Sequence, residues 1–306
     1  MFILLNFSKK SSAFFLKLLL IILTITLLVC ASACSNNNSD NTHRLQWWLN
    51  AINWDVQNRT NGLSGKGVVI AVIDTAIDES HPDLKDKIIE QYIVDGGYGD
   101  LQYEHGTAVV GIICASPNNE DGVLGIAVDA KIISVVISNH TEAQLGALVE
   151  GIEYAITKNV DIINISAGII ENNPKLQSAI NKAYSAGIVI VAASGNDLYG
   201  TKMYPASYDN VISVDSIDSN GRKLYGQDSN SVFLPGGNIV TTYSSSYDPK
   251  KYVSYSGTSM SAPMLTGVIA LILEQNPSLT SQEITSYFLN HQTTEFDTVQ
   301  ILKDFK

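Results

Sequence analysis

Runs of apolar residues alternate with segments of helical periodicity along most of the chain. The apolar runs are 68–73, 132–137, 160–165 and 188–192. Such continuous runs are typical of strands that are buried on both faces of a sheet. The segments with helical spacing are 105–115, 142–157 and 175–186. This alternation predicts an α/β fold with three layers: a mainly parallel β-sheet with helices on both faces.

The C-terminal part of the chain follows a different pattern. Residues 222–255 are rich in Gly and Ser, which predicts loops with short antiparallel pairs. A long helix is predicted from Ser259 to about Glu274, and the segment 277–283 predicts a stop followed by a capped helix. No internal repeat is visible. We therefore expect one domain over 46–292 and a C-terminal tail over 293–306.

A targeting signal stands at the N-terminus. Three lysines precede an apolar stretch, 18–29, and small residues follow it at 31–33. Cys34 comes next, and Ala-Ser-Ala-Cys resembles the cleavage box of bacterial lipoproteins. We expect a lipoprotein-type signal peptide over 1–33, lipidation of Cys34, and a polar tether over 34–45. Ordinary cleavage and an uncleaved anchor stay open, although the stretch is short for a spanning helix.

Composition narrows the class of protein. The chain has 306 residues and a net charge of -11, which argues against nucleic-acid binding because that binding relies on clustered cations. Of its three cysteines, Cys30 would leave with the signal and Cys34 would carry lipid. Cys114 then stands alone, so no intrachain disulfide is expected, and its apolar neighbours indicate a buried small side chain. We expect a monomer.

Three short segments each place one member of an Asp/His/Ser set beside a strand or helix. Asp74 follows a buried strand, so its carboxylate emerges at the carboxyl edge of the sheet, where ligands of open parallel sheets bind. His105 begins a helix, whose dipole disfavours the imidazolium there. Ser259 begins another helix, whose free N–H groups can face a developing oxyanion. Each residue alone has a common structural use, as a turn Asp, a surface His or a helix-capping Ser.

The order Asp, His, Ser, with Ser-Gly-Asn196 between the last two, resembles the subtilisin-like serine peptidases. The resemblance covers 46–290 and implies a subtilisin-like fold. It implies hydrolysis of peptide bonds through an acyl-enzyme: Ser259 attacks, His105 takes and returns the proton, Asp74 holds His105, and Asn196 donates to the oxyanion. Two positions differ from the family's usual pattern: Ala76 stands where Gly is usual, and Ala108 where a second His is common.

Two other functions are alternatives to an active endopeptidase. A peptide-binding or immunity lipoprotein could share the fold without catalysis, but all four key residues are present in this chain. An α/β-hydrolase esterase needs a Gly-x-Ser-x-Gly elbow with Ser before Asp and His, and this chain has neither. We expect a serine endopeptidase tethered to the outer face of the bacterial cytoplasmic membrane, with secretion as the alternative.

The resemblance also implies a groove in which the substrate adds as a strand. One wall would be Ser166, Ala167 and Gly168, and the other Ala193, Ser194 and Gly195. Asp197 would lie at the rim of the first specificity pocket and Met203 near its floor. These two residues favour a basic or medium-sized side chain before the cut.

A structural calcium site is a further implication of the resemblance. Asp83 matches a family calcium ligand, Gln46 would add an oxygen, and Asn119 lies in the corresponding loop; hard oxygen ligands suit Ca²⁺. A solvated acidic turn is the alternative. Calcium would have no part in the chemistry. Between Cys34 and the domain, no folding prodomain of the family fits, a feature shared by some dedicated maturation peptidases. The short chain and the expected tether favour a processing role with few substrates over bulk degradation.

Overall fold

The apolar runs form strands of a parallel sheet. The computed structural model describes residues 45–54, 62–94, 104–117, 122–137, 145–201, 203–225, 230–244, 251–291 and 295–306. Within these residues seven strands pair in the order β2-β3-β1-β4-β5-β6-β7, and every pairing is parallel. The strands are β1 (Val69–Asp74), β2 (Ile88–Ile93), β3 (Lys131–Val136), β4 (Ile162–Ile165), β5 (Val189–Ala193), β6 (Ile212–Ile217) and β7 (Val232–Pro235).

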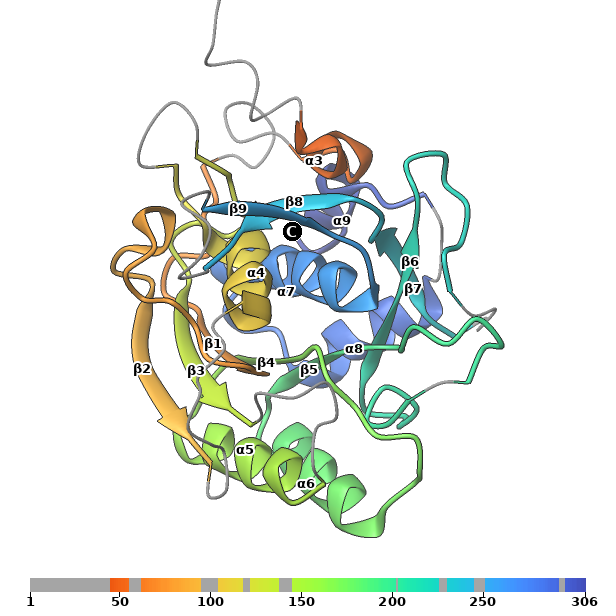
Figure 1. Ribbon diagram of the computed structural model, residues 1–306. Coiled ribbons are helices and arrows are strands. Elements are labelled where there is room, and N and C mark those ends of the chain that lie inside the picture. The colour runs from red at the N-terminus through yellow and green to blue at the C-terminus, as the bar shows by residue number, and fades with distance from the viewer. Residues whose placement is uncertain are drawn as a thin grey trace, which may run out of the picture. The chain divides into compact units, whose positions relative to one another are not determined.

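Side chains of β1, β3, β4 and β5 alternate between two hydrophobic cores, one on each face of the sheet. Ile70 and Val72 of β1 point into one core, and Ala71 and Ile73 point into the other. Helices α4 and α7 cover the first face, while α5 and α6 cover the second (Figure 1). The helices are α3 (Trp47–Ala51), η2 (Pro82–Leu84, 3-10), α4 (Glu104–Cys114), α5 (Leu145–Thr157), α6 (Pro174–Ser185), α7 (Thr258–Gln275), α8 (Ser281–Asn290) and α9 (Thr298–Asp304).

The three-layer α/β fold expected from the sequence is confirmed. The Gly- and Ser-rich segment contains an antiparallel pair, β8 (Ile239–Thr242) with β9 (Tyr252–Tyr255), as expected. It also contains β7, which joins the parallel sheet and was not foreseen. The edge strand β2 was missed as well. Helix α8 has the expected capping box between Thr280 and Glu283.

Residues after 292, expected to form a tail, include a packed helix. Both the N–H and the hydroxyl of Thr298, at the start of α9, donate to Ile52 O, at 3.0 and 2.8 Å. Ile301 and Leu302 are buried in the same core as Trp48. The C-terminal helix therefore ties the end of the domain to the segment that begins it.

No helix among the described residues has the length and apolar character needed to cross a membrane. The signal peptide 1–33 and Cys34 lie outside the described residues. Cys114 is buried with a free thiol, as the sequence indicated. Burial raises its pKa to about 12.

Candidate active site

Asp74 and His105 come together because α4 packs directly against the turn after β1. Gly106 permits this contact: a Cβ at that position would lie 2.3 Å from Thr75 O. The Gly106 N–H donates to Thr75 Oγ1 at 2.8 Å. His105, one residue earlier, then reaches Asp74, and its Nδ1 lies 2.7 Å from Asp74 Oδ1. The Ala at position 76 fits this turn, since its φ is not positive.

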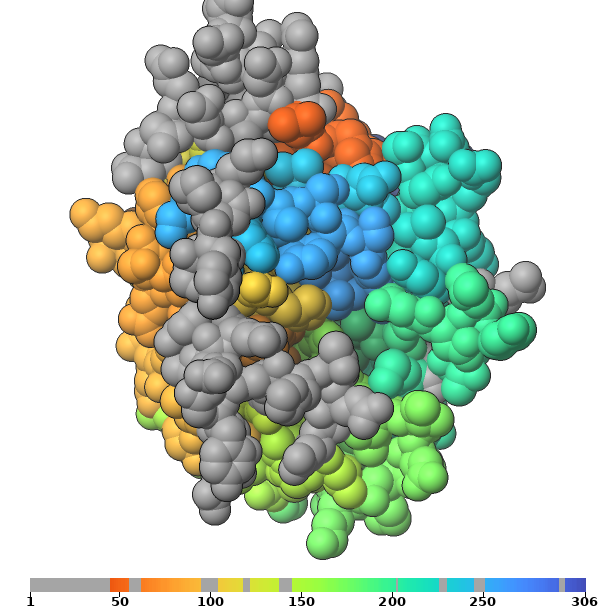
Figure 2. Space-filling view, in the orientation of Figure 1, coloured from red at the N-terminus to blue at the C-terminus, as the bar shows by residue number. Residues whose placement is uncertain are grey.

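The other nitrogen of His105 faces the candidate nucleophile. His105 Nε2 lies 3.0 Å from Ser259 Oγ, although the two residues are 154 positions apart. Because Nδ1 donates to the Asp74 carboxylate, Nε2 is the acceptor for the Ser259 hydroxyl. The segments that carry these residues, the start of α4 in yellow and the start of α7 in blue, adjoin on the surface shown in Figure 2.

The charge of Asp74 governs the pKa of His105. Burial favours the neutral imidazole, but the Asp74 carboxylate outweighs burial by charge attraction and by its hydrogen bond, so the pKa of His105 is raised above its usual value. The helix-dipole argument from the sequence suggested the opposite direction. It was wrong because a full charge at 2.7 Å outweighs the partial charge of a helix end.

One oxygen of Asp74 makes both of its hydrogen bonds. Oδ1 accepts from His105 Nδ1 and from the Thr75 N–H, the latter at 2.7 Å. The Asp74 side chain is only 2% exposed, and Oδ2 is buried without a hydrogen-bond partner among the described residues. The carboxylate is therefore held on one side only.

Asn196 is oriented by Thr258. Asn196 Oδ1 accepts from the Thr258 N–H (2.9 Å) and the Thr258 hydroxyl (3.1 Å), so its Nδ2 must point away from Thr258. A Cβ on Gly257 would lie 3.1 Å from this Nδ2 and 3.4 Å from Ser259 Oγ, and Gly257 has φ +152°. Glycine therefore keeps open the space beside both groups. Sequence reasoning missed the role of Thr258, although its place in the Gly-Thr-Ser string was a signal.

A proline frees the carbonyl of Ser259. Pro263 lies in the second turn of α7, and its missing N–H leaves Ser259 O without the usual i+4 donor. Ser166 Oγ donates to this carbonyl instead, at 3.3 Å. Ser166 in turn accepts from Asn164 Nδ2 at 3.1 Å, and Asn164 Oδ1 accepts from Thr266 Oγ1 at 2.9 Å. This partly buried chain of hydrogen bonds, which the sequence did not predict, links β4 to the start of α7.

The expected walls of the substrate groove extend from two neighbouring strands. Ser166, Ala167 and Gly168 follow β4, while Ala193, Ser194 and Gly195 end β5 and continue beyond it. Gly195 N–H donates to Thr258 Oγ1 at 3.2 Å, which places this wall beside the nucleophile helix. Met203 lies between the two walls, close to both Gly168 and Gly195. Asp197 lies in the loop that connects Gly195 to Met203.

The candidate calcium ligands take part in hydrogen bonds to one loop. Asp83 is fully buried, and its Oδ2 accepts from Val123 N–H (3.0 Å) and Tyr252 OH (2.9 Å). The amide of Gln46 makes two hydrogen bonds with the backbone of Leu124, at 2.9 and 3.1 Å. Asn119 lies outside the described residues, and the residues described include no cluster of three acidic, His or Cys side chains suited to a metal. The carboxylate oxygens of Asp83 are ligands of the kind that Ca²⁺ prefers. Calcium binding stays a prediction.

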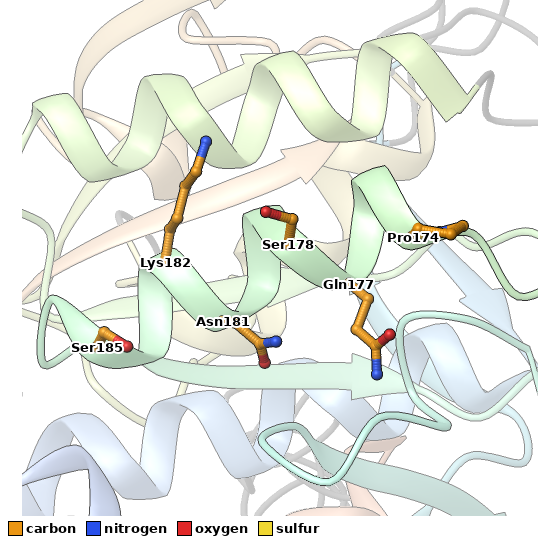
Figure 3. A pocket seen from close by; sticks show the side chains of 6 residues that line it. All are labelled: Pro174, Gln177, Ser178, Asn181, Lys182 and Ser185. Atoms are coloured by element: carbon orange, nitrogen blue, oxygen red, sulfur yellow. The ribbon is translucent and has the colours of Figure 1, made fainter.

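A hollow of another kind lies on the outer surface of α6 (Figure 3). Five polar side chains and one proline of this single helix line it: Pro174, Gln177, Ser178, Asn181, Lys182 and Ser185. Lys182 is bound to Glu153 of α5 at 2.8 Å. Helix α6 covers the face of the sheet opposite α4 and α7, so this hollow is separate from the Asp-His-Ser cluster.

The geometry of the Asp74, His105 and Ser259 side chains defines the class of protein. An Asp-His-Ser relay at the carboxyl ends of a parallel sheet, with an amide donor beside the Ser, is the arrangement of a serine hydrolase. The comparisons give the family. The model of the subtilase family matches residues 65–302. The chain therefore belongs to the subtilase family.

Individual relatives agree with this assignment. A thermostable alkaline protease of Halalkalibacterium halodurans is 37% identical over 251 residues, which cover 78% of this chain and 65% of that protein. Subtilisin DY of Bacillus licheniformis is 35% identical, with 74% and 84% covered. A protease structure from Pseudoalteromonas arctica has a TM-score of 0.75 at 26% identity and covers 86% of this chain and 98% of its own. The chain thus spans slightly less than two thirds of the first relative's length.

Proposed function

We propose that this chain is an active serine endopeptidase that cleaves polypeptides through an acyl-enzyme. One observation carries the proposal: His105 lies within hydrogen-bonding distance of both Asp74 Oδ1 (2.7 Å) and Ser259 Oγ (3.0 Å). Ser259 Oγ attacks the peptide carbonyl while His105 Nε2 takes its proton and later gives it to the leaving amine. Asp74 keeps the proton on Nδ1 and stabilises the imidazolium.

The developing oxyanion has two donors in this proposal. The first is Asn196 Nδ2, which Thr258 turns toward the space beside Gly257. The second is the N–H of Ser259, which lies in the first turn of α7 and has no intrahelical acceptor. Two donors that are already in place lower the barrier without reorganisation during the reaction.

The test is cleavage of a diverse peptide library by the full chain, purified in detergent, with products identified by mass spectrometry. The Ser259→Ala variant should lose all cleavage, whereas Ser185→Ala, on the outer surface of α6, should keep it. Cleavage that survives in Ser259→Ala would refute the assigned nucleophile. A folded chain that binds peptides but cuts none would favour the binding-protein alternative.

We also propose that Cys34 carries lipid and tethers the enzyme outside the cytoplasmic membrane, where a processing role with few substrates suits it. Support comes from the basic, apolar and small-residue order that ends at Cys34. Mass spectrometry of the N-terminal peptide should show acylated Cys34 as the first residue. An unmodified N-terminus at another position would support secretion instead.

Bound calcium is a further part of the proposal, with Asp83 as its ligand at the loop 122–124. Support is the fully buried carboxylate of Asp83 and its contact with this loop. Calcium should raise the Tm of the wild type and leave that of Asp83→Asn unchanged. An equal rise in both would place the ion elsewhere.

A further inference from the structure

The position of the Asp74 carboxylate depends on the backbone turn that follows β1. Asp74 Oδ1 accepts from His105 Nδ1 and from the Thr75 N–H, whereas Oδ2 has no hydrogen-bond partner among the described residues. The second donor belongs to the turn itself. A change in the path of residues 75–77 would therefore move Thr75 and alter the contact between Asp74 and His105.

This turn packs closely against the start of α4, the helix that carries the catalytic imidazole. The Gly106 N–H donates to Thr75 Oγ1 at 2.8 Å, and the Asp78 N–H donates to Thr107 Oγ1 at 2.9 Å. A Cβ on Gly106 would lie 2.3 Å from Thr75 O and 2.8 Å from Ala76 O. The backbone of the turn and the backbone of the helix are thus in direct contact.

A side chain of the edge strand β2 holds the same turn from the sheet (Figure 1). Gln91 Oε1 accepts from the Ile77 N–H and from the Ser134 hydroxyl, both at 2.9 Å. A backbone N–H can only donate, so the amide atom of Gln91 that faces it is the oxygen. Ser134 lies opposite Gln91 on β3 and is fully buried, so its hydroxyl orients the amide from within the sheet.

We propose that Gln91 is a positioning residue for the reaction, which acts through the turn after β1 to hold the Asp74 carboxylate against His105. Ile77 is only 1% exposed, and a buried N–H without an acceptor is costly. The turn therefore keeps its path only while an acceptor stands opposite the Ile77 N–H. This inference rests on the proposed function, because it assumes that Asp74 and His105 act together in catalysis.

The test compares Gln91→Met, which keeps the length of the side chain but removes the acceptor, with Gln91→Glu, which keeps an acceptor oxygen. Both are assayed in the full chain with a peptide that the wild type cleaves. Gln91→Met should lower kcat about three- to tenfold, the worth of one hydrogen bond, with little change in KM. Gln91→Glu should keep kcat within about threefold of the wild-type value and above that of Gln91→Met.

The pH profile shows whether the effect passes through the catalytic pair. Burial lowers the pKa of His105, but the charge and the hydrogen bond of Asp74 raise it above its usual value overall. A displaced Asp74 raises this pKa less. The acidic limb of kcat/KM, which reports the free enzyme, should therefore move to lower pH in Gln91→Met.

Asp161→Leu is the matched control. Asp161 Oδ2 accepts from the Val69 N–H at 2.8 Å, so this side chain also holds a backbone N–H of β1, but at the end of the strand away from Asp74. Its loss should lower Tm, as Gln91→Met should, and leave kcat and the acidic limb at their wild-type values. The proposal would be overturned if both variants changed kcat equally, or if Gln91→Met changed Tm alone.

Ser134→Ala is a milder second variant, for the case that Gln91→Met does not fold. It leaves Gln91 in place but removes the hydroxyl that orients its amide. The acidic limb should move in the same direction as expected for Gln91→Met, and kcat should fall about twofold, since one of two anchors remains. A wild-type limb and a wild-type kcat would then overturn the proposal.

Nuclear magnetic resonance separates this inference from the proposed function. In Ser259→Ala, which performs no chemistry, the pKa of His105 is read from the proton and nitrogen signals of its ring, with and without Gln91→Met. A lower pKa of His105 with Gln91→Met supports the positioning role even if the wild type cuts no peptide. If the chain cuts peptides and neither kcat nor the pKa of His105 responds to Gln91→Met, the positioning role fails alone.

Discussion

Asp74→Asn should lower kcat/KM by about 10³–10⁴. Two charges about 4 Å apart at an effective dielectric of 20 interact by about 4 kcal/mol, which corresponds to about 10³ in rate. The His105 side chain is 35% exposed, so solvent screening makes the expected loss of rate smaller. Loss of the correct His105 tautomer makes the expected loss of rate larger. The same change in a serine peptidase of an unrelated fold costs about 10⁴.

The geometry of Asp74 makes the two orientations of the new amide costly for different reasons. Oδ1 accepts both hydrogen bonds. An Asn that keeps its oxygen there puts an NH₂ group at the buried Oδ2 position, where no acceptor lies among the described residues, at about 1–3 kcal/mol. The flipped amide directs its NH₂ group at the Thr75 N–H, where two donors face each other, and at His105 Nδ1. To accept from the amide, Nδ1 must lose its proton, so His105 carries its proton on Nε2. His105 then cannot accept the proton of Ser259.

The assay measures kcat/KM from pH 5 to 10 with one peptide that the wild type cleaves, together with Tm. Because Asp74 raises the pKa of His105, the acidic limb of the wild-type profile should lie above the ordinary imidazole value of about 6.5. The residual activity of Asp74→Asn should have its limb at lower pH, since burial then acts unopposed. Asp78→Asn, a change in the loop that follows β1, should leave kcat/KM within about threefold of the wild-type value because Asp78 touches no catalytic group. A loss of kcat/KM below tenfold in Asp74→Asn, or an acidic limb of its pH profile at higher pH than in the wild type, would refute this reasoning.

Two further substitutions and one labelling experiment test other parts of the structure. Asn196→Ala should lower kcat by about 10²–10³ with little change in KM, in steady-state kinetics; a loss mainly in KM would contradict an oxyanion role. Gly111→Ala should lower the free energy of unfolding by about 1–3 kcal/mol, measured in urea, because its Cβ would lie 2.1 Å from Thr242 Oγ1; an unchanged value would mean that α4 and β8 pack less closely. Cys114, whose burial raises its pKa to about 12, should react with a thiol reagent only after unfolding; rapid labelling of the native chain would contradict its burial.

Strands that are buried on both faces could be predicted from the sequence, and strands of other kinds could not. β1, β3, β4 and β5 have continuous apolar runs because helices cover both sides of them. The edge strand β2 is mostly half exposed, and its sequence IIEQYI includes two polar residues that interrupt the run. β7 has four residues inside a Gly- and Ser-rich segment, so its length gave no periodicity to detect. The sequence did not predict β2 because it is an edge strand, and it did not predict β7 because that strand is short.

The members of the Asp-His-Ser set could be predicted because each stands in a distinctive string, but the groups that hold them could not. Thr258 and Ser166 have no pattern that separates them from ordinary capping residues. Their roles depend on which carbonyl or amide lies opposite, and that is decided by the pairing of β4 with β5 and by the path of α7. Contacts between segments about 60 to 90 residues apart cannot be seen in local spacing.

Pro263 shows how a residue that weakens a helix can help to position a nucleophile. A proline in the second turn of α7 removes one backbone hydrogen bond, which alone destabilises the helix. The freed carbonyl belongs to Ser259, and Ser166 donates to it from the end of β4. The bond that would have stayed within the helix is replaced by one between the helix and the sheet. Because β4 also adjoins β1, which carries Asp74, this exchange fixes the Ser259 backbone to the same sheet that positions its catalytic partners.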